Sequence, residues 1–232
     1  MNIARWAAIP AALAICLAAS GCGGSSSGNS ASAPSPPAPT ALASQVRTAV
    51  RHASSVHING TVNQASRSIG MNLSLTRSGE FSGQMSANGA GFTVLSTQGG
   101  IYIKVTDAFL KYLKLPSTAC NLVCGKYLKT TPSQAGSLVG QLSMSALFGK
   151  LNSASPPKLS YAGTATVSGQ TTWKYHSADG GTVYVAAHGK PYPLQLVAPS
   201  NRGKLTFSKW NSVTIPGPPP ASKVVDLNQL HG

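Results

Sequence analysis

The segment Ile69-Gly70-Met71-Asn72-Leu73-Ser74-Leu75 sets a pattern that most of the chain repeats: apolar residues alternate with small or polar ones. Successive side chains of a β-strand point to opposite faces of the sheet, so this segment buries one face and leaves the other to solvent. Arg77-Ser78-Gly79 follows it and indicates a turn. The sequence therefore predicts a strand of an antiparallel sheet with one apolar face.

The same alternation recurs on both sides of this segment, with short turn signals between the runs. The apolar positions of the first half are Val56, Ile58, Val62, Phe81, Met85, Phe92, Val94, Ile101, Ile103 and Val105. Further strands are expected at 158–167, 171–176, 182–187, 192–198 and 204–209, with turns such as Asn88-Gly89, Gly99-Gly100 and Ser168-Gly169. Short connections favour hairpins, hence an antiparallel meander.

Two regions have helical spacing instead. Residues 41–54 carry an apolar stripe of Leu42, Val46, Ala49, Val50 and Ala53, with Thr40 placed to cap the helix. Residues 107–115 and 132–151 form a central helical region around a cysteine loop. We predict an α+β fold: a strongly curved antiparallel sheet of about ten strands, forming a half-barrel, with a leading helix and a central helical insert on its concave face.

The N-terminus has the features of an export signal. A positive tip with Arg5 precedes an uncharged apolar segment from Trp6 to Ala19, which is too short for a membrane span of ~20 residues. Ala19-Ser20-Gly21-Cys22 then resembles the bacterial lipobox, although that pattern favours Leu at the position of Ala19. The resemblance implies lipidation of Cys22 and cleavage before it; the alternative is a plain secretory signal with an incidental cysteine.

The expected organisation has three parts. Residues 1–21 are the signal peptide, residues 22–40 are the lipidated cysteine and a Gly/Ser/Pro-rich tether, and residues 41–232 are the folded domain. This predicts a protein anchored by lipid to the extracytoplasmic face of the cell membrane.

The charge balance indicates the kind of partner. The chain has 18 basic and 4 acidic residues, and only 9% of its residues are charged. An excess of basic residues outside the cytoplasm suits anionic lipid headgroups or an anionic wall polymer. The basic residues are scattered singly, without the clusters and aromatic motifs of nucleic-acid binding, so nucleic acid is not an expected partner.

Cys120 and Cys124 are the cysteines that remain after Cys16, in the signal, and Cys22. In an oxidising compartment a close pair is expected to form a local disulfide. Free thiols, a redox pair and a metal site are the alternatives.

The strand order resembles actinobacterial lipoproteins of the LppX/LprG type, which have the LolA-like fold. The resemblance is carried by residues 55–60, 99–104, 169–175, 182–185, 191–194 and 207–210. It implies an apolar cavity for acyl chains of envelope lipids or lipidated cargo. The expected cavity residues are Ile58, Met71, Leu73, Leu75, Phe92, Val94, Ile101, Ile103, Leu142, Val183, Val185, Leu194 and Leu196.

No catalytic, metal or cofactor site is expected. Asp107 is placed to cap a helix and Asp179 lies in an Asp-Gly-Gly turn, while the five histidines lack metal-ligand spacing. Trp173 and Trp210 are read first as structural residues. The sequence therefore favours a lipid-binding or lipid-carrying lipoprotein without enzymatic activity. The rival hypothesis is an interaction or sensor lipoprotein, or a binder of wall polymer.

Overall fold

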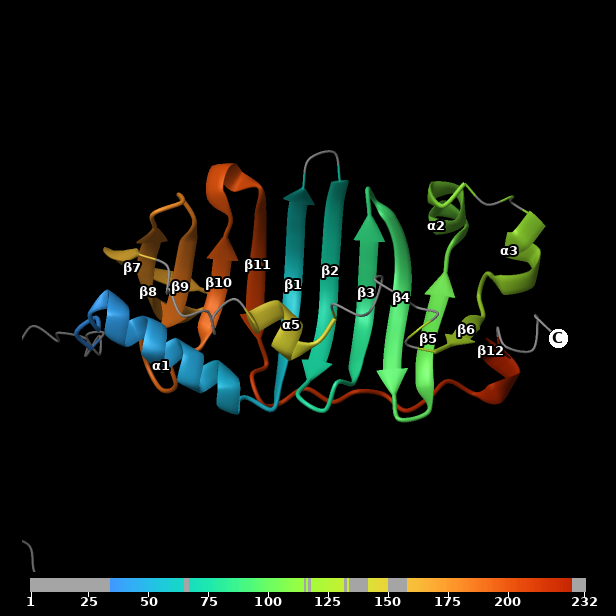
Figure 1. Cartoon of the computed structure of the whole chain (residues 1–232), viewed down its shortest axis with the longest axis horizontal. Helices are drawn as coiled ribbons and strands as arrows, with labels where there is room; N and C mark the ends of the chain where they lie inside the picture. The colour runs from blue at the N-terminus through green and yellow to red at the C-terminus, as the bar shows by residue number, and fades with distance from the viewer. Residues whose placement is uncertain are drawn as a thin grey trace, which may run out of the picture. The chain divides into compact units, whose positions relative to one another are not determined.

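The computed structural model describes residues 34–64, 67–114, 116, 118–131, 133, 142–149 and 158–226. Within them, twelve strands form one sheet in the order β12-β6-β5-β4-β3-β2-β1-β11-β10-β9-β8-β7 (Figure 1). The proposed signal peptide, Cys22 and the tether as far as residue 33 lie outside the described residues, as do Leu138 and Val139 of the predicted insert. None of the helices in the described ranges is long and apolar enough to cross a membrane.

The elements of the first half are α1 (Pro39–His52), β1 (Ser55–Gln64), β2 (Arg67–Thr76), β3 (Phe81–Ala87), β4 (Ala90–Thr97), β5 (Gly100–Val105), α2 (Asp107–Tyr112), α3 (Thr118–Val123), β6 (Tyr127–Thr130) and α5 (Met144–Phe148). Those of the second half are β7 (Leu159–Val167), β8 (Gln170–Ser177), β9 (Thr182–Ala186), β10 (Pro193–Val197), β11 (Gly203–Ser208) and β12 (Val224–Asp226), with 3₁₀ turns at Pro199–Asn201 and Ala221–Lys223.

Two antiparallel meanders, β1–β6 and β7–β11, are joined into one sheet by their inner strands. β1 pairs with β11 from His57↔Ser208 to Val62↔Gly203. After β11 the Pro-rich segment passes along the strand ends (Figure 1), where the Val213 amide donates to Ser55 Oγ at 3.1 Å. It ends in β12, which pairs with β6 and is parallel to it.

One face of the sheet carries the core. Ile58, Leu73 and Val94 share a row across β1, β2 and β4 through Gly83 of β3, and each is at most 2% exposed. Helices α1 and α5 cover this face (Figure 1). The opposite face of the same strands presents His57, Ser74 and Ser82. The alternation in the sequence therefore gives one apolar and one polar face, as expected.

The predicted half-barrel is wrong in its curvature. The sheet is open, is not strongly curled, and has twelve strands rather than about ten. Its end strands β7 and β12 do not meet, and helices cover the apolar face without closure of the sheet. β6 and β12 were not predicted as strands, because four- and three-residue strands carry too little alternation.

The predicted boundary and cap of the leading helix are also corrected. α1 begins at Pro39 and ends at His52, and its N-cap residue, Ala38, makes no side-chain capping bond. Proline favours the first helical position because its fixed φ already suits the helix and it has no amide hydrogen left unpaired. Asp107 is the first residue of α2, and Thr106 rather than Asp107 caps it by accepting from the Phe109 amide.

A disulfide joins Cys120 and Cys124, which confirms the pairing expected from the sequence. Both cysteines lie at α3, one helical turn apart, and the Cys124 amide donates to the Cys120 carbonyl at 2.9 Å. The bridge therefore fixes the turn that leads from α3 into β6.

Candidate functional site

An apolar pocket of about 550 Å³ lies between α1 and the sheet. Its helical wall is the first half of α1, where Leu42 and Val46 are spaced four residues apart and point toward the strands. The volume is within the range of ~300–1,000 Å³ that is usual for small-molecule sites. We call this space the apolar pocket.

The strand wall of the apolar pocket is a row of branched side chains. Leu205 of β11 faces Leu196 of β10, and Leu196 faces Val183 of β9. Leu196 is 37% exposed, although it lies on the face that elsewhere forms the core. The pocket therefore leaves uncovered apolar area that a hydrocarbon chain would cover.

In the middle of the same face, aromatic side chains of the described residues pack against one another. Phe148 of α5 lies 5.6 Å from Phe207 and 5.7 Å from Trp210, measured between ring centroids. Phe109 of α2 packs on Phe92 at 4.3 Å. The inserted helices thus supply side chains to the core.

The structure distributes the thirteen expected cavity residues over several places. Val183, Val185 and Leu196 line the apolar pocket. Met71 and Phe92 line a more polar cleft of about 470 Å³ on β1–β4. The central core contains Ile58, Leu73, Leu75, Val94, Ile101 and Leu142, with Ile103 packed against it. Leu194 lies in a separate small cluster with Val167 and Ala186.

Sequence reasoning missed the pocket residues contributed by α1 and by β1 and β11, which include Leu42, Val46, Val62 and Leu205. The apolar stripe of the leading helix was visible as a signal, since it predicts packing of this helix on the sheet. Which strands it covers depends on the β1–β11 pairing, which joins residues about 150 positions apart.

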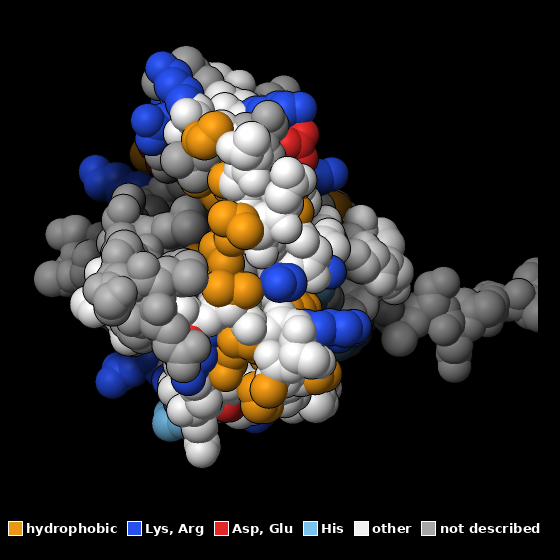
Figure 2. All heavy atoms as spheres, turned by 90° about the vertical axis from the view of Figure 1, so that its right-hand side faces the viewer, with side chains coloured by type: hydrophobic (Ala, Val, Ile, Leu, Met, Phe, Trp, Pro, Cys, Tyr) orange, Lys and Arg blue, Asp and Glu red, His pale blue; other side chains and the backbone are white. Residues whose placement is uncertain are grey.

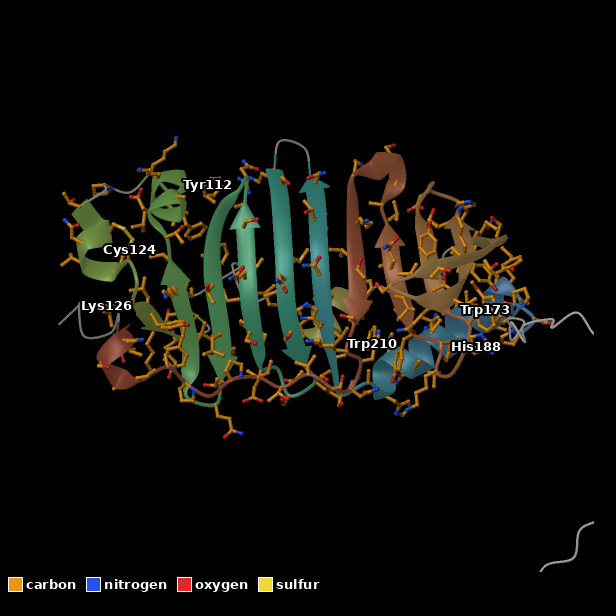
Figure 3. All side chains as sticks on the ribbon, turned by 180° about the vertical axis from the view of Figure 1, so that it is seen from behind. Tyr112, Cys124, Lys126, Trp173, His188 and Trp210 are labelled. Atoms are coloured by element: carbon orange, nitrogen blue, oxygen red, sulfur yellow. A yellow bond between two sulfur atoms is a disulfide. The ribbon has the colours of Figure 1, made fainter. Side chains whose placement is uncertain are left out.

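The chain just before α1 is bound to the sheet. Trp173 Nε1 donates to the Pro34 carbonyl at 3.1 Å, and the Tyr175 hydroxyl donates to the Pro37 carbonyl at 2.6 Å. Burial and the neighbouring Tyr161 raise the pKa of Tyr175, which keeps its hydroxyl a donor. Figure 3 shows Trp173 at the end of the molecule where α1 begins.

A second cleft of about 550 Å³ lies on the other side of α1, toward α5, and we call it the arginine cleft. Its described lining residues are Arg47, Thr48, Val50, Arg51, His52, Arg77, Met144, Ser145 and Phe148. Arg47 also lines the apolar pocket, so this side chain borders both spaces. Its Nε is buried and has no hydrogen-bond partner within the described part of the chain.

No protein-family model and no curated protein matches the chain. Among solved structures, LprF from Mycobacterium bovis superposes with a TM-score of 0.55 at 17% identity, over 78% of this chain and 98% of LprF. The fold is that of LprF. The Mycobacterium tuberculosis lipoprotein LppX is also similar, with a TM-score of 0.48 at 18% identity over 77% of this chain and 100% of LppX. The predicted resemblance to LppX/LprG-type lipoproteins is thereby confirmed at the level of fold.

On this LprF-like sheet the titratable groups are dispersed. His57 Nδ1 lies 3.0 Å from Ser74 Oγ, and burial together with the charge of Lys209 lowers the pKa of His57. The Ser177 hydroxyl and the Gly181 amide donate to Asp179, and both bonds lower its pKa. Across the described ranges, no group of three His, Cys, Asp or Glu side chains forms a metal-binding cluster.

The end of the LprF-like sheet farthest from α1 exposes apolar side chains next to lysines. Tyr112, Leu113 and Leu122, at α2 and α3, are 38%, 48% and 71% exposed. Figure 2 views this end and shows a band of apolar side chains with lysine and arginine on both sides of it. Figure 3 places Tyr112, Cys124 and Lys126 at this end of the molecule. We call Tyr112, Leu113 and Leu122 the α2–α3 patch.

Proposed function

We propose that the protein is a cell-envelope lipoprotein that binds or carries acylated lipids or lipidated cargo in the apolar pocket. Residues 1–21 would be its signal peptide, Cys22 its lipid anchor on the extracytoplasmic face of the membrane, and residues 22–40 the tether to the domain of residues 41–232. The supporting observation is the apolar pocket, in which Leu196 stays 37% exposed on the core face.

Physical chemistry supports hydrocarbon as the occupant. A space lined by Leu42, Val46, Val183 and Leu196 offers water few hydrogen-bond partners. Each buried methylene group of a ligand gains ~0.8 kcal/mol, so one acyl chain supplies substantial affinity without any catalytic group. Binding or carriage therefore needs no enzyme chemistry, in agreement with the dispersed titratable groups.

Native mass spectrometry of the chain extracted from its own membrane tests the proposal. Bound lipid is expected in the native chain and is expected to be lost in Leu196→Trp, which fills the pocket. Leu122→Trp is the matched control, because Leu122 is 71% exposed at α3. Absence of lipid from the native chain, or equal lipid in both variants, contradicts the proposal.

An interaction lipoprotein is the second candidate, and the α2–α3 patch favours it. Three large apolar side chains gathered on one exposed end are typical of a contact surface. Leu122→Ser is expected to abolish retention of a membrane partner while lipid binding stays unchanged. If the native chain and Leu122→Ser retain equal amounts of the membrane partner, the α2–α3 patch is not the contact surface.

A further inference from the structure

We propose that the arginine cleft binds the anionic headgroup of an amphiphile whose hydrocarbon chain occupies the apolar pocket. The inference rests on the proposed lipid binding and adds the chemistry of the head, a phosphate or a carboxylate attached to the chain. A zwitterionic or neutral head would gain less from this cleft.

The two spaces are connected through one side chain. Arg47 projects from α1 and borders the apolar pocket on one side and the arginine cleft on the other. The pocket wall on its side consists mainly of aliphatic residues, whereas the cleft adds Arg51, His52 and Arg77. A molecule that passes Arg47 thus moves from an apolar to a basic environment, which matches the two parts of an amphiphile.

The arginine cleft is basic, and no acidic residue among its described lining residues offsets the positive charge. Its described lining includes three arginines and a histidine but no carboxylate. The chain has four acidic residues, and the ion pairs found in the described residues join Asp107 to Lys111 and Asp226 to Lys129. An anion in the cleft would therefore meet guanidinium groups that no neighbouring carboxylate neutralises.

Arg47 and Arg77 have N–H groups that could donate to an anion. Arg77 is held by the end of α1, where its Nε donates to the Ala53 carbonyl at 2.7 Å and its Nη2 donates to the Val50 carbonyl at 2.8 Å. This leaves the N–H groups of Nη1 for a ligand. Arg47 Nε is buried and unpaired in the described part of the chain, which is costly unless an acceptor arrives. An oxygen of a phosphate or carboxylate supplies that acceptor.

Asp179 indicates how the ligand would be oriented in the apolar pocket. Asp179 lines the pocket, and its carboxylate is engaged by Ser177 and Gly181 of its own turn. Its negative charge disfavours an anionic head beside it. The head is therefore expected at Arg47, with the chain directed toward β9 and β10.

Isothermal titration calorimetry tests this assignment. The protein is the full chain with Cys22→Ser, which prevents lipidation. The three probes are dodecyl phosphate, the uncharged monolaurin and inorganic phosphate. Arg47→Gln is expected to weaken binding of dodecyl phosphate tenfold or more and to leave monolaurin unchanged, since bonds to charged groups contribute ~1.5–3 kcal/mol. Arg51→Gln, at an exposed position, is expected to weaken dodecyl phosphate several-fold without disturbing the fold. Arg67→Gln on β2, outside the cleft, is the matched control.

The outcomes separate the headgroup site from the proposed function. In one outcome, Leu196→Trp abolishes monolaurin binding, but Arg47→Gln and Arg51→Gln leave the affinity for dodecyl phosphate unchanged. This result overturns the headgroup site and supports lipid binding in the apolar pocket. In another outcome, inorganic phosphate binds as tightly as dodecyl phosphate and its affinity depends on Arg47 in the same way. The cleft would then be a site for free anions, and the proposal of an amphiphilic ligand would be wrong. If neither twelve-carbon probe binds, both proposals fail.

Discussion

Removal of the Tyr175 hydroxyl is expected to destabilise the fold by releasing the segment before α1. Tyr175 is 0% exposed, and its hydroxyl donates to the Pro37 carbonyl at 2.6 Å. A neutral hydrogen bond contributes ~0.5–1.5 kcal/mol, and the partly exposed Pro37 carbonyl regains water once the bond is lost. Tyr175→Phe should therefore lower the free energy of unfolding by about 1 kcal/mol, or the Tm by ~2–4 °C for a domain of this size.

Urea denaturation of a double-mutant cycle measures this effect. The cycle combines Tyr175→Phe with deletion of residues 34–37, which removes the accepting carbonyl, and the loss caused by Tyr175→Phe should vanish in the shortened chain. Tyr161→Phe is the matched control, because Tyr161 is 43% exposed and its ring lies 5.4 Å from that of Tyr175. Equal losses in both backgrounds would refute the reasoning, because the hydroxyl would then act through something other than Pro37.

Three further substitutions test the sheet. Leu73→Ala, at a position 0% exposed, should cost ~2–5 kcal/mol in chemical denaturation, and a loss below ~1 kcal/mol would mean that the core there relaxes freely. Gly60→Ala should cost at least ~1 kcal/mol more than Gly79→Ala: both have positive φ, but only at Gly60 would a Cβ collide with the backbone of Lys204. Because the pKa of His57 is lowered from 6.5, the unfolded chain binds the proton first, so stability should fall as the pH drops below 6.5. His57→Gln should flatten that fall in urea midpoints compared between pH 7.5 and pH 5.5, and an unchanged slope would exclude His57 as its source.

The strands of both meanders were predictable because their signals are local. Ile69 to Leu75 alternates in the sequence, and the same residues alternate between the two faces of β2. The turn glycines were equally visible, since Asn88-Gly89 joins β3 to β4 and both residues have positive φ. Element type therefore followed from period and turn chemistry wherever a strand had five residues or more.

The curvature of the sheet and the location of the pocket were not predictable in this way. Both depend on how α1, α5 and the β1–β11 pairing arrange segments that are distant along the chain. The alternation marks Leu73 and Leu196 alike as core-facing, yet Leu73 is 0% exposed and Leu196 is 37% exposed. The helix that covers each leucine makes the difference. Aromatic side chains such as Phe148 of α5 pack on the central face, whereas the smaller aliphatic side chains Leu42 and Val46 of α1 leave the apolar pocket beside Leu196.

This difference between the two helices also explains why the apolar pocket and the basic side chains lie next to each other. A helix of small and branched residues leaves space on its sheet-facing side, and its flanks remain free to carry cations such as Arg47 and Arg51. The end of α1 presents the carbonyl groups of Val50 and Ala53, which accept from Arg77 of the turn after β2 and so add a third guanidinium to the same cleft. The apolar pocket and the arginine cleft are therefore two consequences of one helix sequence, and Arg47, which borders both, connects them.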